Sequence, residues 1–462
     1  MDAKTYLQHL KINGKQATLD MILDAKEERV QHQQEYLSQG KTLICFTLNI
    51  PGTCKRCDLF DRGFELGCEL ILQQLTWNHI KLVKQEKICS EAGCELYVLC
   101  DSDALHIKTL MLQIEEHSDF GRLLDIDVLD QTGQKISRSD VGIKPRRCLL
   151  CEEMAAVCGR SRAHSYEDLL LKIIEILQET FAKQFLDRVE TNAVRALIYE
   201  VAVSPKPGLV DRFNSGSHSD MDFFTFIDSA STLAPSFRSF AQQGRELANY
   251  PVQEVLSQLR YPGRLAEEKM NQSTRGVNCH KGIIFSLGVI CCAIGMRYEQ
   301  GKSFSVHETL QLSKEICTSL LDDFKDIKEP YSYGEKLYIE YGIKGIRGEA
   351  ADGYPSVENI ALPALKRYLS QGLSYNDAGV WTLLELLAVT EDSNILSRSD
   401  METLRIIQSQ ARELLNAQEH SIQTISELDL QFIKKNLSPG GCADLLALTY
   451  FLHFMEEQVN VR

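Results

Sequence analysis

The sequence predicts an α/β (or α+β) N-terminal domain followed by a larger all-α C-terminal domain. Three observations support this fold class. The chain of 462 residues exceeds the usual size of one compact domain. Strand-like runs occur only before residue 130, and from about Ser165 the hydrophobic pattern is helical almost throughout. We therefore expect two domains, residues 1–182 and 183–462, with the boundary between Glu179 and Arg188.

The first part alternates helical and strand-like segments. A helical pattern runs over 17–39, and a run rich in β-branched and aromatic residues over 42–50 ends at a Pro-Gly pair, which is typical of a strand followed by a turn. A second helix is expected over 60–78, and further strands over 95–100 and 124–129.

The second part shows helical periods without a convincing strand after residue 200. Helices are predicted over 166–181, 186–203, 281–299, 306–324, 360–369, 378–390, 401–415 and 442–456. This part should therefore fold as a bundle of helices.

Composition narrows the class of function. The formal net charge of −14 argues against a nucleic-acid partner, which would require a basic face. The longest apolar segment, 283–296, is interrupted by Ser286 and Gly288, so we expect no membrane partner and a cytoplasmic location. In that compartment the 15 cysteines should be mostly thiols. Anionic substrates would have to be bound by local clusters of Arg and Lys.

Two carboxylates stand out in the last predicted strand. Asp125 and Asp127 are two residues apart, so a strand presents both on one side. Paired carboxylates suit a Mg²⁺ ion that also holds phosphate oxygens, and Arg122 just before them could grip a phosphate. The alternative is a solvated turn, for which Asp-x-Asp is equally common.

A basic, cysteine-containing segment follows at 144–164. Four arginines make it suited to a pyrophosphate or an acidic protein partner, unless they form only a solvated loop: Arg146, Arg147, Arg160 and Arg162. The same segment contains possible zinc ligands: Cys148, Cys151, Cys158 and His164. The Cys-x-x-Cys half fits zinc, but the spacing to the histidine is marginal, so we prefer buried free thiols.

Together these segments resemble a known family. Leu48–Gly52, Gly121–Val128 and Arg146–Ser165 are similar to the apo-citrate lyase phosphoribosyl-dephospho-CoA transferases, over nearly all of residues 20–180. The resemblance implies transfer of a phosphoribosyl-dephospho-CoA group to a serine of the citrate lyase acyl-carrier subunit, with release of pyrophosphate. It also implies that Asp125 and Asp127 hold Mg²⁺ on that pyrophosphate while Arg122 neutralises its charge, a chemistry dominated by positioning.

In the second part, 200–222 combines prolines, cations and glycines. Two prolines stiffen the loop after a helix, and Lys206, Gly208 and Arg212 offer the cations and bare backbone that bind phosphate. Three further candidates are less specific. Asp211 could bind Mg²⁺ or could only pair with the neighbouring Arg212. His218 and Asp222 lie in a polar loop before a helix, where a histidine is as often an ordinary surface residue.

Four more polar clusters lie at predicted helix ends. Their candidate residues are Asn278, His280 and Lys281; Arg347 and Glu349; Asp392 and Asn394; and Gly440, Gly441 and Asp444. Helix N-termini favour anions, whereas the cluster around Asp392 ends an apolar helix, where cations are favoured. Each cluster could be ordinary capping. Together they predict one polar active site at converging helix ends.

These segments resemble the triphosphoribosyl-dephospho-CoA synthases, in order, over 190–455. Only the residues after Arg398 depart from the family pattern, with Ser399 and Asp400 in place of a glycine pair. The resemblance implies that ATP and 3′-dephospho-CoA are joined with expulsion of adenine through an oxocarbenium-like ribose. We expect Lys206, Arg212, Lys281 and Arg347 to clamp the triphosphate, and Mg²⁺ to sit on some of Asp211, Asp222, Asp392 and Asp444.

The chemistry also needs a base and an acid, for which Glu349 and His280 are the candidates. Two alternatives remain open. A Mg²⁺-dependent nucleotide hydrolase or nucleotidyltransferase would use similar acidic pairs and clamps. The N-terminal domain could instead be a carrier-protein docking module without catalysis.

Overall fold

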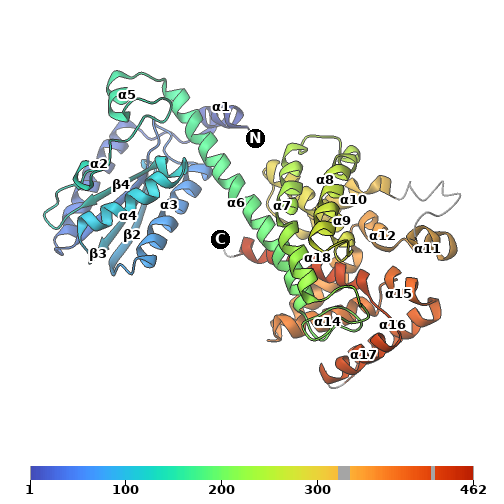
Figure 1. Ribbon diagram of the computed structural model, residues 1–462. Coiled ribbons are helices and arrows are strands. Elements are labelled where there is room, and N and C mark those ends of the chain that lie inside the picture. The colour runs from blue at the N-terminus through green and yellow to red at the C-terminus, as the bar shows by residue number, and fades with distance from the viewer. Residues whose placement is uncertain (1, 321–332, 418–421, 461–462) are drawn as a thin grey trace. The chain divides into compact units, whose positions relative to one another are not determined.

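The computed structural model describes residues 2–320, 333–417 and 422–460 (Figure 1). The chain divides into two compact units, Met1–Gln184 and Phe185–Arg462. The division lies inside one helix, α6 (Tyr166–Ala202), where the sequence pattern predicted two separate helices. The polar residues near Gln184 do not interrupt that helix because helical hydrogen bonding continues through them.

The N-terminal unit is a four-stranded antiparallel sheet with helices on both faces. The strand order is β2-β3-β1-β4. Its strands are β1 (Thr42–Leu48), β2 (Leu82–Ser90), β3 (Gly93–Cys100) and β4 (Leu124–Leu129). Its helices before α6 are α1 (Ala3–Asn13), α2 (Leu19–Leu37), α3 (Asp58–Trp77), α4 (Ala104–His117) and α5 (Ala155–Ser161), with short 3₁₀ turns at Phe120–Leu123 and Ser139–Val141.

The two faces of this sheet bury different side chains. Helices α3 and α4 cover the face of Ile44, Phe46 and Ile126 and form the larger core (Figure 1). Helix α2 covers the other face through Tyr36, whose ring stacks on Tyr97. The predicted strands and the helices at 17–39 and 60–78 are confirmed. Strand β2 was missed because its side chains are mostly exposed and give no alternating apolar signal.

The C-terminal unit is helical, and the predicted all-α class is confirmed for its described residues, which contain no strand. Its helices are α7 (Phe223–Glu246), α8 (Val252–Ser273), α9 (Lys281–Glu299), α10 (Val306–Ile316), α11 (Tyr333–Tyr341), α12 (Gly345–Asp352), α13 (Leu362–Ser370), α14 (Tyr375–Leu387), α15 (Ser393–Arg398), α16 (Met401–Leu415), α17 (Ile422–Lys434) and α18 (Gly440–Asn460). A turn of π-helix at Val357–Ala361 precedes α13. The predicted end of the helix at 306–324 lies outside the described residues.

Helix α9 is the centre of this unit. It packs against α7, α8, α10 and α18, and almost its whole circumference is buried (Figure 1). It is also the one described helix long and apolar enough to cross a membrane, but 78% of its apolar window is buried inside the protein. Such burial on all sides is typical of a core helix. Its apolar composition is therefore explained by packing.

Candidate functional site

Strand β4 presents Asp125 and Asp127 on the face covered by α2, as their spacing predicted. Asp127 pairs with Lys135 at 2.5 Å. Partial desolvation of Asp125, together with the charge of Asp127, raises the pKa of the Asp125 carboxyl. A partly desolvated carboxylate beside a second one is a suitable place for a divalent cation.

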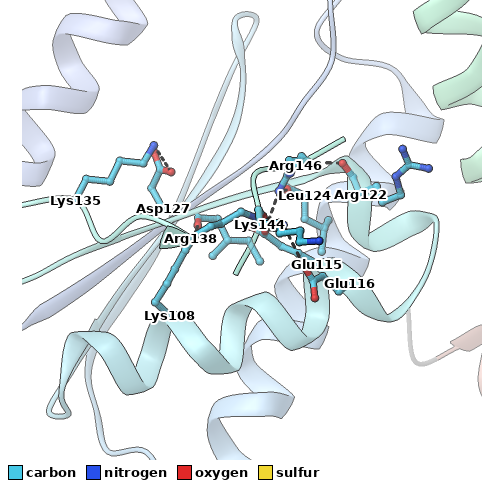
Figure 2. A network of polar contacts seen from close by, with 11 residues as sticks. Lys108, Glu115, Glu116, Arg122, Leu124, Asp127, Lys135, Arg138, Lys144 and Arg146 are labelled. Carbon is cyan, nitrogen blue, oxygen red and sulfur yellow. Dashed lines mark hydrogen bonds and ion pairs between the residues drawn. The ribbon is translucent and has the colours of Figure 1, made fainter. Parts of the chain in front are cut away.

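Arg122 and Arg146 do not face this pair. Arg122 points away from Asp127 (Figure 2), and its Nη2 donates to the backbone oxygen of Cys148 at 2.6 Å. Arg146 donates to the backbone oxygen of Leu124 at 2.8 Å. Both guanidinium groups are thus used to hold the following loop against the start of β4. The phosphate-gripping role expected for them is not supported by these contacts.

A carboxylate buried in α4 organises the same arginines. Glu115, 3% exposed, binds Arg138 at 2.7 Å and Arg146 at 2.8 Å (Figure 2). A buried charge requires such partners, because leaving it unpaired would cost several kcal/mol (~3–5). Sequence reasoning could not identify this support, since Glu115 lies in a helix that the pattern did not predict.

Other cations lie beside Asp125. A cleft of about 180 Å³ is lined by Asp125 and by Lys26, Arg29 and Lys55. Burial, and then the charges of Lys26 and Arg29, lower the pKa of Lys55. The positive charges of Lys26, Arg29 and Lys55 repel one another in this cleft. Such a concentration of positive charge is expected where a protein binds a polyphosphate. The signal for Lys26 and Arg29 was present in their one-turn spacing on α2, but it resembles an ordinary solvated helix face.

The basic segment after β4 has an exposed and a buried part. Arg160 and Arg162 are exposed, and Arg147 pairs with exposed Glu152. The structure gathers the four possible zinc ligands, Cys148, Cys151, Cys158 and His164, so that their ligand atoms lie within 4.8 Å of one another. Elsewhere Cys89 and Cys94 form a disulfide across the β2–β3 turn, an exception to the expectation of thiols.

In the C-terminal unit the predicted polar helix ends line one cavity of about 720 Å³. The first turns of α9, α12 and α18 contribute, together with the loop after α6. Eleven of the predicted residues line it: Lys206, His218, Asn278, His280, Lys281, Glu349, Asp392, Asn394, Gly440, Gly441 and Asp444. Helix N-termini offer unpaired backbone N–H groups, so this arrangement favours an anion.

Buried carboxylates face the same cavity. Burial, and then the charges of Glu200 and Asp392, raise the pKa of Asp444 well above its ordinary value. Burial also raises the pKa of Glu200, Asp392 and Glu349. Four carboxylates whose charged forms are all disfavoured indicate that a cation or a proton belongs among them.

Asp392 joins two helices. It caps α15 through the N–H groups of Asn394 and Ile395, at 2.8 and 3.2 Å, and accepts from Cys442 N–H at 2.9 Å. The cluster follows the apolar helix α14, as the sequence predicted, and a second helix, α15, begins within it at Ser393. The side chain lies between two helix N-termini rather than at a C-terminus.

Two glycines permit the close approach of these acids. A Cβ on Gly282 would lie 2.0 Å from Asp444 Oδ2, and one on Gly441 would lie 3.0 Å from Asp392 Oδ2. Glycine is needed at these two helix starts because a side chain there would collide with Asp444 or crowd Asp392.

His280 lies at the start of α9 with its ring fully enclosed. Its Nδ1 is 2.7 Å from Ser229 Oγ, and its Nε2 is buried without a hydrogen-bond partner. Burial and the charge of Lys206 lower the pKa of His280 to about 3. The ring is therefore neutral near pH 7, which contradicts the predicted role of His280 as an acid in the unliganded protein.

Cations reach the cavity from several elements. Lys206 is buried and paired with Glu200, whereas Lys281 is exposed and binds Glu267 at 3.1 Å. His218 Nε2 is 2.9 Å from Ser438 Oγ. The lining residues that sequence reasoning missed include Glu200, which lies at the end of a predicted helix, and Arg398, which precedes the loop that departs from the family pattern.

Five predicted residues lie elsewhere. Asp222 is exposed and caps α7, and Asp211 accepts from backbone N–H groups at 206, 213 and 214. Neither lines the cavity in which the metal was expected. Arg212 binds Asn376 at 2.7 Å, and Gly208 N–H binds Asp429. Arg347 lines a neighbouring, more apolar cavity with Lys281. Four of these residues stabilise local structure through hydrogen bonds, and Arg347 contributes to the neighbouring cavity.

Comparisons with known proteins divide at the same place as the fold. Residues 17–180 match the family model of CitX, described as apo-citrate lyase phosphoribosyl-dephospho-CoA transferase. Residues 186–462 match that of CitG, described as ATP:dephospho-CoA triphosphoribosyl transferase. The two matches fall in the two structural units, in the order that the sequence resemblance implied.

Individual relatives span both units. Protein CitXG of Haemophilus influenzae is 36% identical over 458 residues, covering 96% of this chain and 97% of that protein. Protein CitXG of Leuconostoc mesenteroides subsp. cremoris is 30% identical over 467 residues, covering 95% and 97%. The 2-(5''-triphosphoribosyl)-3'-dephosphocoenzyme-A synthase of Pectobacterium atrosepticum is 39% identical over 266 residues, covering 57% of this chain and 88% of that enzyme.

Proposed function

The chain belongs to the CitXG family, and from this membership we infer that its two units catalyse two consecutive transferase reactions. The protein is a bifunctional enzyme that makes and attaches the prosthetic group of citrate lyase. The C-terminal unit is the CitG triphosphoribosyl transferase, and the N-terminal unit is the CitX transferase. The observation that carries this assignment is the match of both families, in order, to two separately folded units.

For the C-terminal unit we propose ATP and 3′-dephospho-CoA as substrates of the large cavity. A ribose hydroxyl of 3′-dephospho-CoA attacks C1′ of the ATP ribose, the bond from C1′ to adenine breaks, and adenine leaves with a proton. The cavity volume of about 720 Å³ lies within the range of ligand sites, about 300–1,000 Å³. The first turns of α9, α12 and α18 favour the triphosphate, and Lys206, Lys281 and Arg398 supply positive charge.

Mg²⁺ fits the carboxylates of this cavity. Asp392 and Asp444 are the proposed ligands, because burial raises the pKa of both carboxyls, the charge of Asp392 adds to the rise at Asp444, and a divalent cation would relieve both. When bound, the ion would neutralise triphosphate charge. Asp211 and Asp222 are not part of this proposal, since neither lines the cavity.

Glu349 is the proposed base for the attacking hydroxyl. Its Oε1 accepts from Ser356 Oγ at 2.5 Å, which fixes the carboxylate, and burial raises its pKa toward the range useful to a base. Neutral His280 contributes a hydrogen bond through its unpartnered Nε2. It serves to position a substrate atom.

For the N-terminal unit we propose transfer of the phosphoribosyl-dephospho-CoA group to a serine of the citrate lyase acyl-carrier subunit. The serine oxygen replaces pyrophosphate, which leaves from the triphosphoribosyl end. Asp125 and Asp127 are the proposed Mg²⁺ ligands, and Lys26, Arg29 and Lys55 line the same cleft as Asp125. Exposed Arg160 and Arg162 suit an acidic carrier protein.

The first test uses the full chain with ATP, Mg²⁺ and 3′-dephospho-CoA. Free adenine equimolar with a CoA product heavier by a triphosphoribosyl unit is the expected result. Release of ADP or AMP without adenine would instead support the nucleotide hydrolase or nucleotidyltransferase, an alternative that the family matches do not favour.

A further inference from the structure

The segment between β4 and α6 gathers four side chains that ligate transition metals. Cys151 Sγ lies 3.5 Å from Cys158 Sγ and 3.3 Å from His164 Nε2. All four ligand atoms, including Cys148 Sγ, lie within 4.8 Å of one another. A tetrahedral ion with Zn–S bonds of about 2.3 Å requires sulfur atoms about 3.8 Å apart, so the cluster already has nearly the dimensions of a zinc site.

The backbone around Cys148 and Cys151 is folded as a metal-binding turn. Cys148 N–H binds Glu153 O at 2.7 Å and Ala155 N–H binds Arg146 O at 2.9 Å, which closes a small hairpin. The hairpin therefore places Cys148 and Cys151 on one short turn. Their Cys-x-x-Cys spacing is the one that paired cysteine ligands of structural zinc sites use.

The remaining two ligands come from α5 and the turn after it. Cys158 is the one buried residue of α5. Arg162 ends this helix in the left-handed conformation, with φ 51°, and the resulting turn brings His164 back toward the three cysteines. A seven-residue helix with a single buried side chain has little apolar packing of its own. Such a segment needs another source of stability, such as a metal.

The surroundings distinguish these cysteines from ordinary buried thiols. Cys54, Cys68 and Cys100 belong to the apolar core of the N-terminal unit, whereas neither Cys148 nor Cys158 belongs to the apolar clusters found among the described residues. A disulfide would use two of the sulfurs and leave the third and the histidine without a role.

We propose that Cys148, Cys151, Cys158 and His164 bind one structural Zn²⁺ ion. Four protein ligands close the coordination sphere, so the ion has no open position for a substrate. This replaces the buried free thiols that the sequence favoured, because spacing along the chain could not show that the turn after α5 brings His164 back to the other ligands.

The zinc-binding loop supports the carboxylate strand. Arg122 donates to the backbone oxygen of Cys148, and Arg146 donates to the backbone oxygen of Leu124, the first residue of β4 (Figure 2). These two hydrogen bonds attach the loop to Arg122 and Leu124, which directly precede Asp125 in the chain. Metal loss should loosen this attachment without touching the C-terminal unit's cavity.

The test is the metal content of the full chain, purified without chelator in a thiol-protecting reductant. We expect about one zinc per chain by mass spectrometry of the metal. Replacement by Co²⁺ should give the thiolate charge-transfer and ligand-field absorption of a tetrahedral site. Well under half a zinc per chain after zinc addition and dialysis, or cobalt without these bands, would overturn the proposal.

Variants then assign the ligands. Cys151→Ser and Cys158→Ser should each lower bound zinc to near zero, and His164→Cys, which keeps a ligand, should retain it. The matched control is Cys57→Ser, a half-buried free thiol in the other Cys-x-x-Cys pair, which should leave zinc unchanged. Measuring adenine release shows whether the C-terminal unit of each variant is folded. Stoichiometric zinc in both Cys151→Ser and Cys158→Ser would contradict the assignment.

Discussion

In each unit a carboxylate has its pKa raised by other carboxylates: Asp125 by Asp127, and Asp444 by Glu200 and Asp392. Desolvation is the larger cause in both places. Arrangements of this kind cost stability in the empty protein, because charged forms are disfavoured and no partner compensates them fully. They are understandable in an enzyme whose substrates carry several phosphates together with a divalent cation.

The acidic pair on β4 gives the first prediction. The double variant Asp125→Asn, Asp127→Asn should lower transfer to the acyl-carrier subunit by at least about 100-fold, since it removes the proposed metal ligands. Adenine release should be unchanged. Asp101→Asn, which alters an exposed carboxylate paired with Lys41, is the control and should retain transfer. Undiminished transfer by the double variant would favour the docking-module alternative.

Glu349 gives a prediction about pH. A base acts when deprotonated, so kcat/KM for adenine release should fall as the pH is lowered. Because burial raises the pKa of Glu349 above its ordinary 4.5, this fall should begin at a higher pH than an exposed glutamate would give.

Glu349→Gln should lower kcat by about 10²-fold or more and remove that acidic limb. Glu358→Gln is the matched control, because Glu358 pairs with His307 outside the cavity lining. A Glu349→Gln enzyme with wild-type turnover and an unchanged pH profile would exclude the assignment.

At the scale of helices, the cavity depends on where helices begin. The glycine-flanked starts of α9 and α18 were visible in the sequence because glycine and polar residues cluster there. What the sequence could not provide was the side of the bundle on which each start lies. That is why Arg347 was predicted in the cavity but lines its neighbour, whereas Glu200 lines it without having been predicted.

Proline and polarity explain three of the missed elements. Helices α7 and α8 contain Pro235 and Pro262 in their interiors, where proline ordinarily signals a break, and tertiary packing overrides that signal. Strand β2 has almost no buried face to generate an alternating pattern. By contrast, α9 and α16 were predicted at their observed bounds, because their apolar patterns are long and begin at polar residues.

The start of α9 gives the third prediction. Gly282→Ala should strongly reduce adenine release while the helical content and thermal unfolding stay close to wild type. The added methyl group would lie 2.0 Å from Asp444 Oδ2 and must displace that carboxylate. Gly263→Ala in α8 is the control, because its added methyl group meets no atom within 4 Å. Equal adenine release by both variants would show that the position of Asp444 does not matter.

At the scale of the molecule, the two sites belong to two units with separate cores. The product of the C-terminal unit is the substrate of the N-terminal unit, so fusion guarantees that both activities are present in equal amounts. The fold class and both families could be predicted from the sequence, because the motifs of each family occur along this chain in the order that the family has. The four possible zinc ligands and the acids Glu349, Asp392 and Asp444 were named from the sequence, but their convergence and burial could be seen only in the folded structure.

Separate sites predict complementation. The Asp125→Asn, Asp127→Asn variant and the Glu349→Gln variant should each fail to modify the carrier, while their mixture should restore modification through the released intermediate. The rate in the mixture should rise with protein concentration. Failure of the mixture, with each variant's other activity intact, would indicate that the intermediate does not leave the chain.

The most direct test is the intact mass of the apo acyl-carrier subunit of citrate lyase after incubation with this protein, ATP, Mg²⁺ and 3′-dephospho-CoA. The account predicts an increase of one phosphoribosyl-dephospho-CoA group on a single serine, with one adenine and one pyrophosphate released per carrier. An unchanged carrier mass, with ATP consumed and no adenine formed, would contradict it.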